Sequence, residues 1–253
     1  MARSPRPAQA DPSTLSEGPP HVSDYDAYAA QLARYTQARE RGGVLGDVLL
    51  QQLLELLGDV TGQRVLDAAC GDGYLARVLA ARGALVTGID VGPRLIERAR
   101  QRDPRGEIDY RVADLSQPLP GESGSFDAVA SHLALNDVRD YRGFIPTLAD
   151  LLKRGGRLVV AFNSPYGAVI RRNVADYFDS GATAPYRGLW AMGIKTYLQH
   201  RTLEEYLDEF LGAGLRLTKL ADSVANCFQP GPDSILPEGS RFPRFMLLRF
   251  TKP

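Results

Sequence analysis

The stretch at residues 64–76, which reads RVLDAACGDGYLA, constrains the fold of this chain more than any other. It predicts a short buried strand, a glycine turn and the start of a helix. Gly71 and Gly73 let the backbone turn sharply and let a ligand approach without Cβ atoms in the way. The next apolar run ends in Asp90. An acid about 20 residues past a glycine loop, at the tip of the second strand, suits the two hydroxyls of a ribose. The pattern therefore predicts a site for a nucleoside-bearing cofactor.

Two further acids bear on which cofactor this is. Asp67 closes the first predicted strand, and Asp72 stands between the two glycines. A dinucleotide places its pyrophosphate at a helix N-terminus, where two carboxylates would repel it. The same carboxylates suit a ligand with an ammonium or sulfonium group. A Gly-x-Gly-x-x-Ala turn by itself also occurs where a helix only packs on a strand, so the prediction rests on the turn and the acids together.

Five segments resemble the class I S-adenosylmethionine-dependent methyltransferases. They are VLDAACGDGY at 65–74, VTGID at 86–90, YRVADL at 110–115, FDAVA at 126–130 and LKRGGRLVV at 152–160, in the order and spacing of that family. The resemblance covers residues 25–253, and RFPRFMLLR at 241–249 is similar to small-molecule members of the ubiquinone/menaquinone-biosynthesis type. One departure is Ala69, where the family often has glycine, and we expect Gly71 and Gly73 to make the essential turn. The resemblance implies S-adenosylmethionine as the cofactor.

The order of the predicted elements indicates an α/β protein with a doubly wound, mostly parallel sheet. The resemblance implies the Rossmann-like version of this fold, with seven strands and an antiparallel terminal strand pair. The predicted strands are residues 64–69, 85–90, 108–113, 126–131, 157–163, 215–224 and 245–252, and the helices within the sheet region are 74–82, 93–102, 140–152 and 203–213.

The chain divides into three predicted parts. Residues 1–20 are rich in Pro, Ser and Ala and are expected to form a disordered leader. Residues 21–60 are expected to form an N-terminal helical cap, and residues 61–253 the methyltransferase domain. Residues 164–200 interrupt the α/β alternation with many aromatic side chains. An insertion after a parallel strand lies beside the ligand crevice, so we expect a lid over the acceptor. The alternative is a small helical subdomain with an aromatic core.

The resemblance also implies roles in cofactor binding. Asp90 would hold the ribose diol, Asp114 would accept a hydrogen bond from the adenine amino group, and Asp67 would line the methionine end. Each acid has a structural alternative as a strand-end cap or turn residue. The complete predicted cofactor set is Asp67, Ala69, Gly71, Gly73, Asp90, Val91, Asp114, Leu115 and His132.

Two histidines are candidate catalytic bases, because imidazole titrates near the working pH. His132 directly follows the fourth predicted strand, and His200 precedes the last predicted helix. A purely structural role is the alternative for both. Acceptor contacts are predicted in the N-terminal helix, in the loop after the fourth strand and in the insertion, at Tyr28, Asn136, Tyr166, Tyr177, Trp190 and Tyr197.

The composition bears on partners and location. The 253 residues carry 30 basic and 30 acidic side chains, so no net charge favours nucleic acid or an anionic membrane. No apolar run approaches the ~20 residues that span a bilayer. Two cysteines and three histidines do not readily supply a zinc site, so no metal is expected. We expect a cytoplasmic protein with a small-molecule acceptor, and a homodimer is left open as its assembly.

These features together predict methyl transfer to a small, partly apolar acceptor by in-line displacement, mainly through proximity and orientation. One alternative is a protein of the same fold that binds the cofactor without methylating. A second is a nicotinamide-dependent dehydrogenase, which would use the same glycine turn. The predicted terminal strand pair counts against the dehydrogenase.

Overall fold

The computed structural model describes residues 44–170, 174, 176–185, 197–223 and 243–253. The predicted leader at residues 1–20 and most of the predicted helical cap lie outside the described residues, as do Tyr28 and Trp190. No helix in the described ranges is long and apolar enough to cross a membrane.

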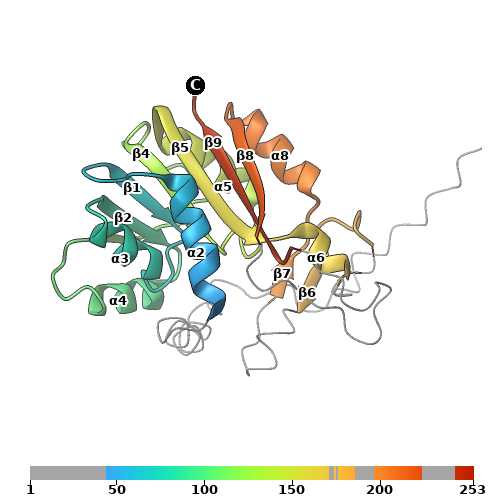
Figure 1. The fold of residues 1–253 in the computed structure, drawn as a ribbon, viewed down its shortest axis with the longest axis horizontal. Coiled ribbons are helices and arrows are strands. Elements are labelled where there is room, and N and C mark those ends of the chain that lie inside the picture. The colour runs from blue at the N-terminus through green and yellow to red at the C-terminus, as the bar shows by residue number, and fades with distance from the viewer. Residues whose placement is uncertain (1–43, 171–173, 175, 186–196, 224–242) are drawn as a thin grey trace, which may run out of the picture.

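A seven-stranded sheet in the order β3-β2-β1-β4-β5-β9-β8 forms the centre of the structure (Figure 1). The first five strands along the chain run parallel, and β9 runs antiparallel to both β5 and β8. The predicted sheet with an antiparallel terminal pair is confirmed. The strands are β1 Arg64–Ala68, β2 Leu85–Asp90, β3 Asp109–Val112, β4 Phe126–His132, β5 Leu152–Asn163, β8 Arg216–Ser223 and β9 Phe245–Thr251.

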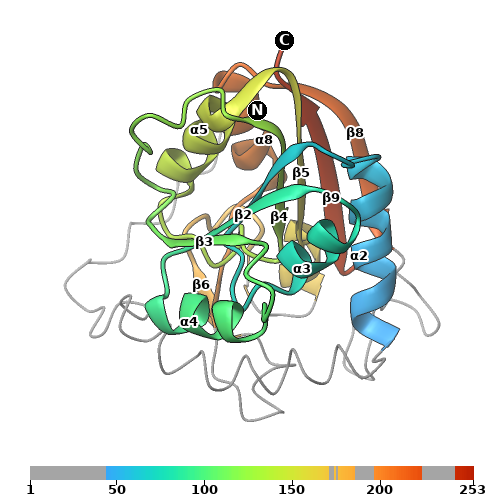
Figure 2. The same ribbon diagram turned by 90° about the vertical axis from the view of Figure 1, so that its left-hand side faces the viewer.

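Helices cover both faces of the sheet (Figure 2). Along β1, Val65 belongs to one hydrophobic cluster and Leu66 to the other, because successive strand side chains point to opposite faces. Both faces being covered explains why the central strands are almost continuously apolar. The first cluster includes side chains of α2 Val44–Leu57, α3 Tyr74–Ala81 and α4 Pro93–Gln101, and the second those of α5 Tyr141–Leu151 and α8 Leu203–Gly212.

Local sequence signals account for several helix ends. Pro93 stands at the first position of α4, where its missing N–H costs no helical hydrogen bond. Thr202 and Glu205 form a reciprocal capping box at the start of α8. The end of α2 depends on a distant residue, since Arg157 of β5 donates hydrogen bonds to the carbonyls of Leu57 and Asp59.

Two elements differ from the sequence prediction. β5 begins at Leu152 and not at residue 157, because the backbone of its first residues finds partners: Gly155 donates to the Lys252 carbonyl and Lys252 donates to the Gly156 carbonyl. The local sequence Lys-Arg-Gly-Gly resembles a turn, and only pairing with the C-terminal end of the chain makes it part of the sheet.

The predicted insertion at residues 164–200 lies beyond the carboxyl end of β5 (Figure 1). Its described part contains the short helix α6 Pro165–Ile170 and a two-stranded antiparallel sheet of β6 Thr183–Pro185 and β7 Tyr197–Gln199. This mixture of helix and sheet differs from the small helical subdomain that the sequence left open.

Candidate functional site

The glycine turn joins the end of β1 to the start of α3. Ala69, Gly71 and Gly73 have φ values of 58°, 57° and 78°, so three positions of this turn are left-handed. Gly71 and Gly73 make the turn as expected, and Ala69 is a third left-handed position that was not expected. Ala69 occupies the left-handed region, which costs a residue with a Cβ about 1–2 kcal/mol. A glycine at this position would avoid that strain.

Asp90 connects the glycine turn with the loop after β2. Its Oδ2 accepts a hydrogen bond from the Gly71 N–H at 2.9 Å, and its Oδ1 accepts one from the Gly92 N–H at 2.8 Å. Burial raises the pKa of this carboxyl group, while the backbone N–H groups of Gly92, Gly71 and Val91 oppose the rise. A carboxylate has about four acceptor positions, so these backbone donors leave room for a further donor. Asp90 therefore caps the loop after β2, which is the structural role that the sequence left open. Its remaining acceptor capacity suits the hydroxyls of a ribose.

A cavity of about 280 Å³ lies directly beside Asp90. Five of the predicted cofactor residues line it, namely Ala69, Asp90, Val91, Asp114 and Leu115. The carboxyl ends of β1, β2 and β3 meet here, as expected for an open parallel sheet. Asp114 also has the alternative role that the sequence left open, because its Oδ1 accepts a hydrogen bond from the Ser116 N–H at 2.9 Å.

The opposite wall of this cavity escaped prediction. It consists of Val138, Arg139 and Asp140 in the loop after β4, together with Phe144 of α5. Asp140 also caps α5 by accepting a hydrogen bond from the Gly143 N–H at 3.0 Å. The signal that could have found this wall is topological, since loops at the carboxyl ends of neighbouring parallel strands converge on one crevice.

The two acids used in the sequence argument about pyrophosphate repel an anion less than predicted, because burial favours the neutral form of Asp67 and a cation pairs with Asp72. Asp67 is 1% exposed, and burial raises its pKa to about 8. Its Oδ2 has no hydrogen-bond partner among the described residues. Asp72 forms an ion pair with Arg102, with 2.6 Å between Oδ2 and Nη1. The electrostatic argument from these two side chains is therefore weakened, and the case for the cofactor rests on the cavity and the fold.

The remaining predicted cofactor residues, Asp67, Gly71, Gly73 and His132, do not line this cavity. Gly71 contacts it only through Asp90. A Cβ at Gly73 would lie 2.2 Å from the Tyr110 hydroxyl oxygen, so this glycine leaves room for a protein side chain. His132 is half-buried at the end of β4. Their contacts with the methionine end stay predictions.

Asn136 joins three loops through its amide and backbone. Its side-chain oxygen accepts a hydrogen bond from the Asn163 N–H at 2.8 Å, and its amide nitrogen donates to the Asn163 carbonyl at 3.4 Å. The Asn136 carbonyl accepts a hydrogen bond from the Gln199 N–H at 2.8 Å. The Asn136 amide thus binds both backbone groups of Asn163 at the end of β5, as a neighbouring strand would. Its predicted contact with the methyl acceptor stays a prediction.

The structure brings together three of the predicted residues of the insertion. Tyr166, which is 43% exposed, stacks on Tyr177 with 5.6 Å between ring centroids. The Tyr177 hydroxyl accepts a hydrogen bond from the Leu203 N–H at 2.9 Å. The buried His200 donates from Nε2 to the Tyr177 carbonyl at 2.8 Å, so only Nδ1 of this ring remains as a proton acceptor. The backbone of Tyr197 pairs with Pro185 in the small sheet.

Arg201 links the insertion to the cavity wall. This residue is 5% exposed, and its Nη2 donates to the Arg139 carbonyl at 2.7 Å. Its guanidinium lies 4.4 Å from the centre of the Tyr141 ring, within range of a cation–π interaction. Sequence reasoning missed Arg201 because a charged residue beside a helix start is usually solvated.

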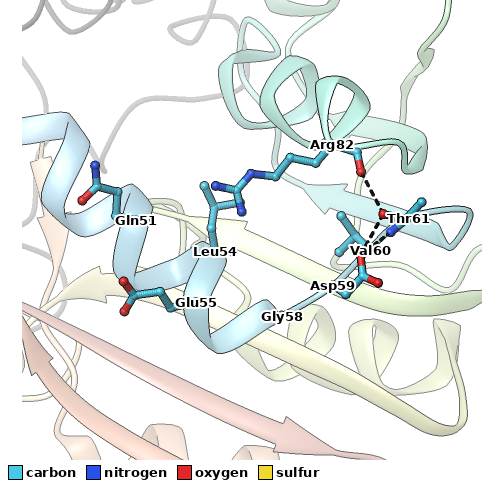
Figure 3. Close-up of a pocket in the computed structure, with 8 residues that line it drawn as sticks. All are labelled: Gln51, Leu54, Glu55, Gly58, Asp59, Val60, Thr61 and Arg82. Carbon is cyan, nitrogen blue, oxygen red and sulfur yellow. Dashed lines mark hydrogen bonds between the residues drawn. The ribbon is translucent and has the colours of Figure 1, made fainter.

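A second cavity of about 560 Å³ lies at the opposite end of β1 (Figure 3). It is lined by the last turns of α2, by residues 58–61 and by Arg82. Thr61 holds this corner, since its hydroxyl donates to Asp59 Oδ1 at 2.8 Å and to the Arg82 carbonyl at 3.4 Å. It contains no residue of the predicted site.

Residues 66–160 match the family described as a methyltransferase domain. This stretch is similar to methyltransferase domains. It runs from β1 into β5 and so includes the glycine turn, Asp90 and both walls of the smaller cavity. The match confirms the predicted resemblance to methyltransferases.

Curated relatives match the same part of the chain. A demethylmenaquinone methyltransferase of Tropheryma whipplei is 40% identical over 126 residues, which are 49% of this chain and 50% of the relative. A ubiquinone biosynthesis O-methyltransferase of Xanthomonas oryzae is 36% identical over 146 residues, or 56% of this chain and 61% of the relative. The matches thus span about half to three fifths of these relatives.

A solved structure extends the likeness over most of the chain. An S-adenosylmethionine-dependent methyltransferase of Mesorhizobium loti superposes with a TM-score of 0.63 at 26% identity, covering 83% of this chain and 100% of that one. Together with the strand order, this likeness confirms the Rossmann-like methyltransferase fold.

Proposed function

We propose that this protein transfers a methyl group from S-adenosylmethionine to a small, partly apolar acceptor with an oxygen, nitrogen or carbon nucleophile. The observation that carries the proposal is the cavity beside the glycine turn of a methyltransferase domain. It combines a buried carboxylate, an apolar wall and a second carboxylate at the ends of three parallel strands.

The residues present fit the nucleoside part of the cofactor. The remaining acceptor positions of Asp90 suit the ribose hydroxyls, and charge assistance strengthens such hydrogen bonds. Val91, Leu115 and Phe144 offer apolar surface to the adenine ring. Asp114 lies on the same cavity and is the candidate partner of the adenine amino group.

The task of the chain in catalysis is mainly positioning. The sulfonium of the bound cofactor supplies an activated methyl group, so the protein needs no electrophile of its own. Alignment of the acceptor nucleophile with the methyl–sulfur bond contributes up to ~7–11 kcal/mol in favourable cases. His132 at the end of β4, and Nδ1 of His200, are the candidate groups for removing a proton from the acceptor.

The insertion supports an acceptor with an aromatic or quinone-like ring. Tyr166 and Phe178 expose 43% and 77% of their surface beyond the carboxyl end of β5, and both contact Tyr177. Such rings suit a flat, partly apolar molecule. The names of the two curated relatives, which concern menaquinone and ubiquinone synthesis, support the same acceptor class.

Calorimetric titration with S-adenosylmethionine, S-adenosylhomocysteine and NAD tests the cofactor first. We expect micromolar binding of the first two compounds and none of NAD. Methyl transfer from labelled S-adenosylmethionine to a panel of phenols, catechols and quinols then tests turnover. Binding without transfer to any acceptor class would support the non-methylating alternative, and binding of NAD alone would refute the proposal.

A further inference from the structure

Tyr110 of β3 fills the space that two glycines leave open. It is 4% exposed and lies opposite Gly88 of β2 in the sheet register. A Cβ at Gly88 would lie 2.8 Å from the Tyr110 ring, and a Cβ at Gly73 would lie 2.2 Å from its hydroxyl oxygen. Both distances are shorter than a Cβ atom tolerates, so the ring packs directly against the backbone of β2 and of the glycine turn.

The same ring connects to the turn at two further points. The Tyr110 hydroxyl donates to the Gly73 carbonyl at 3.5 Å, a long hydrogen bond. A Cβ at Gly88 would also lie 3.1 Å from the sulfur of Cys70. The Tyr110 ring and the Cys70 side chain of the turn therefore both lie next to Gly88. On its other side, the Tyr110 carbonyl accepts a hydrogen bond from Arg100 of α4 at 2.6 Å. Tyr110 is therefore held firmly while it contacts the turn.

The glycine turn needs such outside support. Gly73 begins α3 in a left-handed conformation without any side-chain cap. Arg77 donates to the Asp72 carbonyl at 2.7 Å, and Arg102 forms the ion pair with the Asp72 carboxylate. These contacts hold the turn from α3 and α4, and Tyr110 holds it from the sheet. On the cofactor side, the turn presents Gly71 to Asp90.

We propose that Tyr110 is a positioning residue that sets the affinity for the cofactor by fixing the glycine turn, although it does not line the cavity itself. The proposal rests on cofactor binding at this turn, as set out above. A site held loosely by its supporting residues loses affinity, because the turn must then be ordered when the ligand binds.

The experiment compares Tyr110→Leu, Tyr110→Phe, Gly88→Ala and the double variant Gly88→Ala/Tyr110→Leu. Phe210→Leu is the matched control, since Phe210 is equally buried but packs on Phe250 on the opposite face of the sheet. Two quantities are measured for each: the affinity for S-adenosylhomocysteine, and amide hydrogen exchange of residues 70–73 in the protein without cofactor.

We expect Tyr110→Leu to weaken S-adenosylhomocysteine binding about tenfold and to speed exchange in the turn. Tyr110→Phe, which loses only the long hydrogen bond, should change the affinity about twofold. Gly88→Ala should weaken binding because its Cβ displaces the ring. The double variant should bind no worse than Tyr110→Leu, since leucine leaves room for that Cβ. Phe210→Leu should lower the melting temperature without changing either quantity.

Unchanged affinity and unchanged turn exchange in Tyr110→Leu would overturn the proposal and leave Tyr110 as a core residue. Additive effects of Gly88→Ala and Tyr110→Leu would do the same. If the wild-type protein fails to bind S-adenosylhomocysteine, the proposed function fails, while hydrogen exchange still decides whether Tyr110 fixes the turn.

Discussion

The cofactor side of the sheet and the insertion hold their polar groups in contrasting ways. Beside the glycine turn, Asp90 binds N–H groups that lie 2 and 19 residues away, within one strand–turn–helix–strand unit. In the insertion and the segment after it, His200 and Arg201 donate to carbonyls that lie 23 and 62 residues away. The first arrangement follows from a local pattern. The second depends on which loops meet at the end of the sheet.

This difference explains why the two regions tolerate different changes. In the cofactor region, a substitution of Asp90 removes one carboxylate and the hydrogen bonds that it is proposed to make with the cofactor. In the insertion and the segment after it, a substitution breaks contacts between segments that are far apart in the sequence. We therefore expect the first kind of change to alter binding and the second to alter stability and binding together.

The largest effect is expected for Asp90→Ala. The variant loses the acceptors for the Gly71 and Gly92 N–H groups and those proposed for the ribose. Hydrogen bonds to a charged group contribute about 1.5–3 kcal/mol, so the affinity for S-adenosylmethionine should fall about 100-fold in calorimetry. Asp109→Ala is the control, because this exposed carboxylate pairs with Arg111 of its own strand, β3. Equal affinity of both variants would refute the ribose role.

The next effect concerns Arg201→Gln, which breaks the link between insertion and cavity wall. Loss of its hydrogen bond to the Arg139 carbonyl should lower the free energy of unfolding by about 2 kcal/mol and also weaken cofactor binding. Arg142→Gln is the matched control. That guanidinium lies 5.2 Å from the same Tyr141 ring, but its side chain is 70% exposed. Denaturant titration gives the free energy of unfolding of both variants. Similar losses of stability would show that the buried guanidinium contributes no more than the exposed one.

A pH dependence should come from the cofactor region. Burial raises the pKa of Asp67 to about 8 in the folded protein, against 3.8 as the ordinary value. The folded state therefore holds a proton that the unfolded state releases, and stability falls as the pH rises from about 4 to about 8, by up to about 1.4 kcal/mol per pH unit. Asp67→Asn, which mimics the protonated acid, should reduce this slope. Unfolding curves of the free protein at pH 5 and pH 8 test this, and an unchanged slope would count against the buried proton.

The smallest effect is expected for Ala69→Gly. Relief of the left-handed strain at φ 58° should outweigh the greater freedom of glycine in the unfolded chain and raise stability by about 0.5 kcal/mol. Gly212→Ala serves as a comparison, since its Cβ would meet open space at the end of α8. A lower melting temperature for Ala69→Gly would show that the turn accommodates alanine without strain.

Much of the cofactor region could be predicted residue by residue. Ala69, Asp90, Val91, Asp114 and Leu115 all line one cavity, because strand ends in a parallel sheet converge on the same edge. The electrostatic roles of Asp67 and Asp72 could not be predicted in the same way. They depend on burial and on Arg102, which lies 30 residues further along the chain.

The sequence by itself determined the fold class, the glycine turn and the carboxylate at the end of β2, because strand and helix periodicity and turn chemistry act over a few neighbouring residues. Only the tertiary structure decided three features. They are the far wall of the cavity, the hydrogen bonds of Asn136 and His200 to backbone groups, and the packing of Tyr110 against two glycines. Each of these is a contact between segments brought together by the sheet, and its free energy depends on burial and geometry that no local pattern contains.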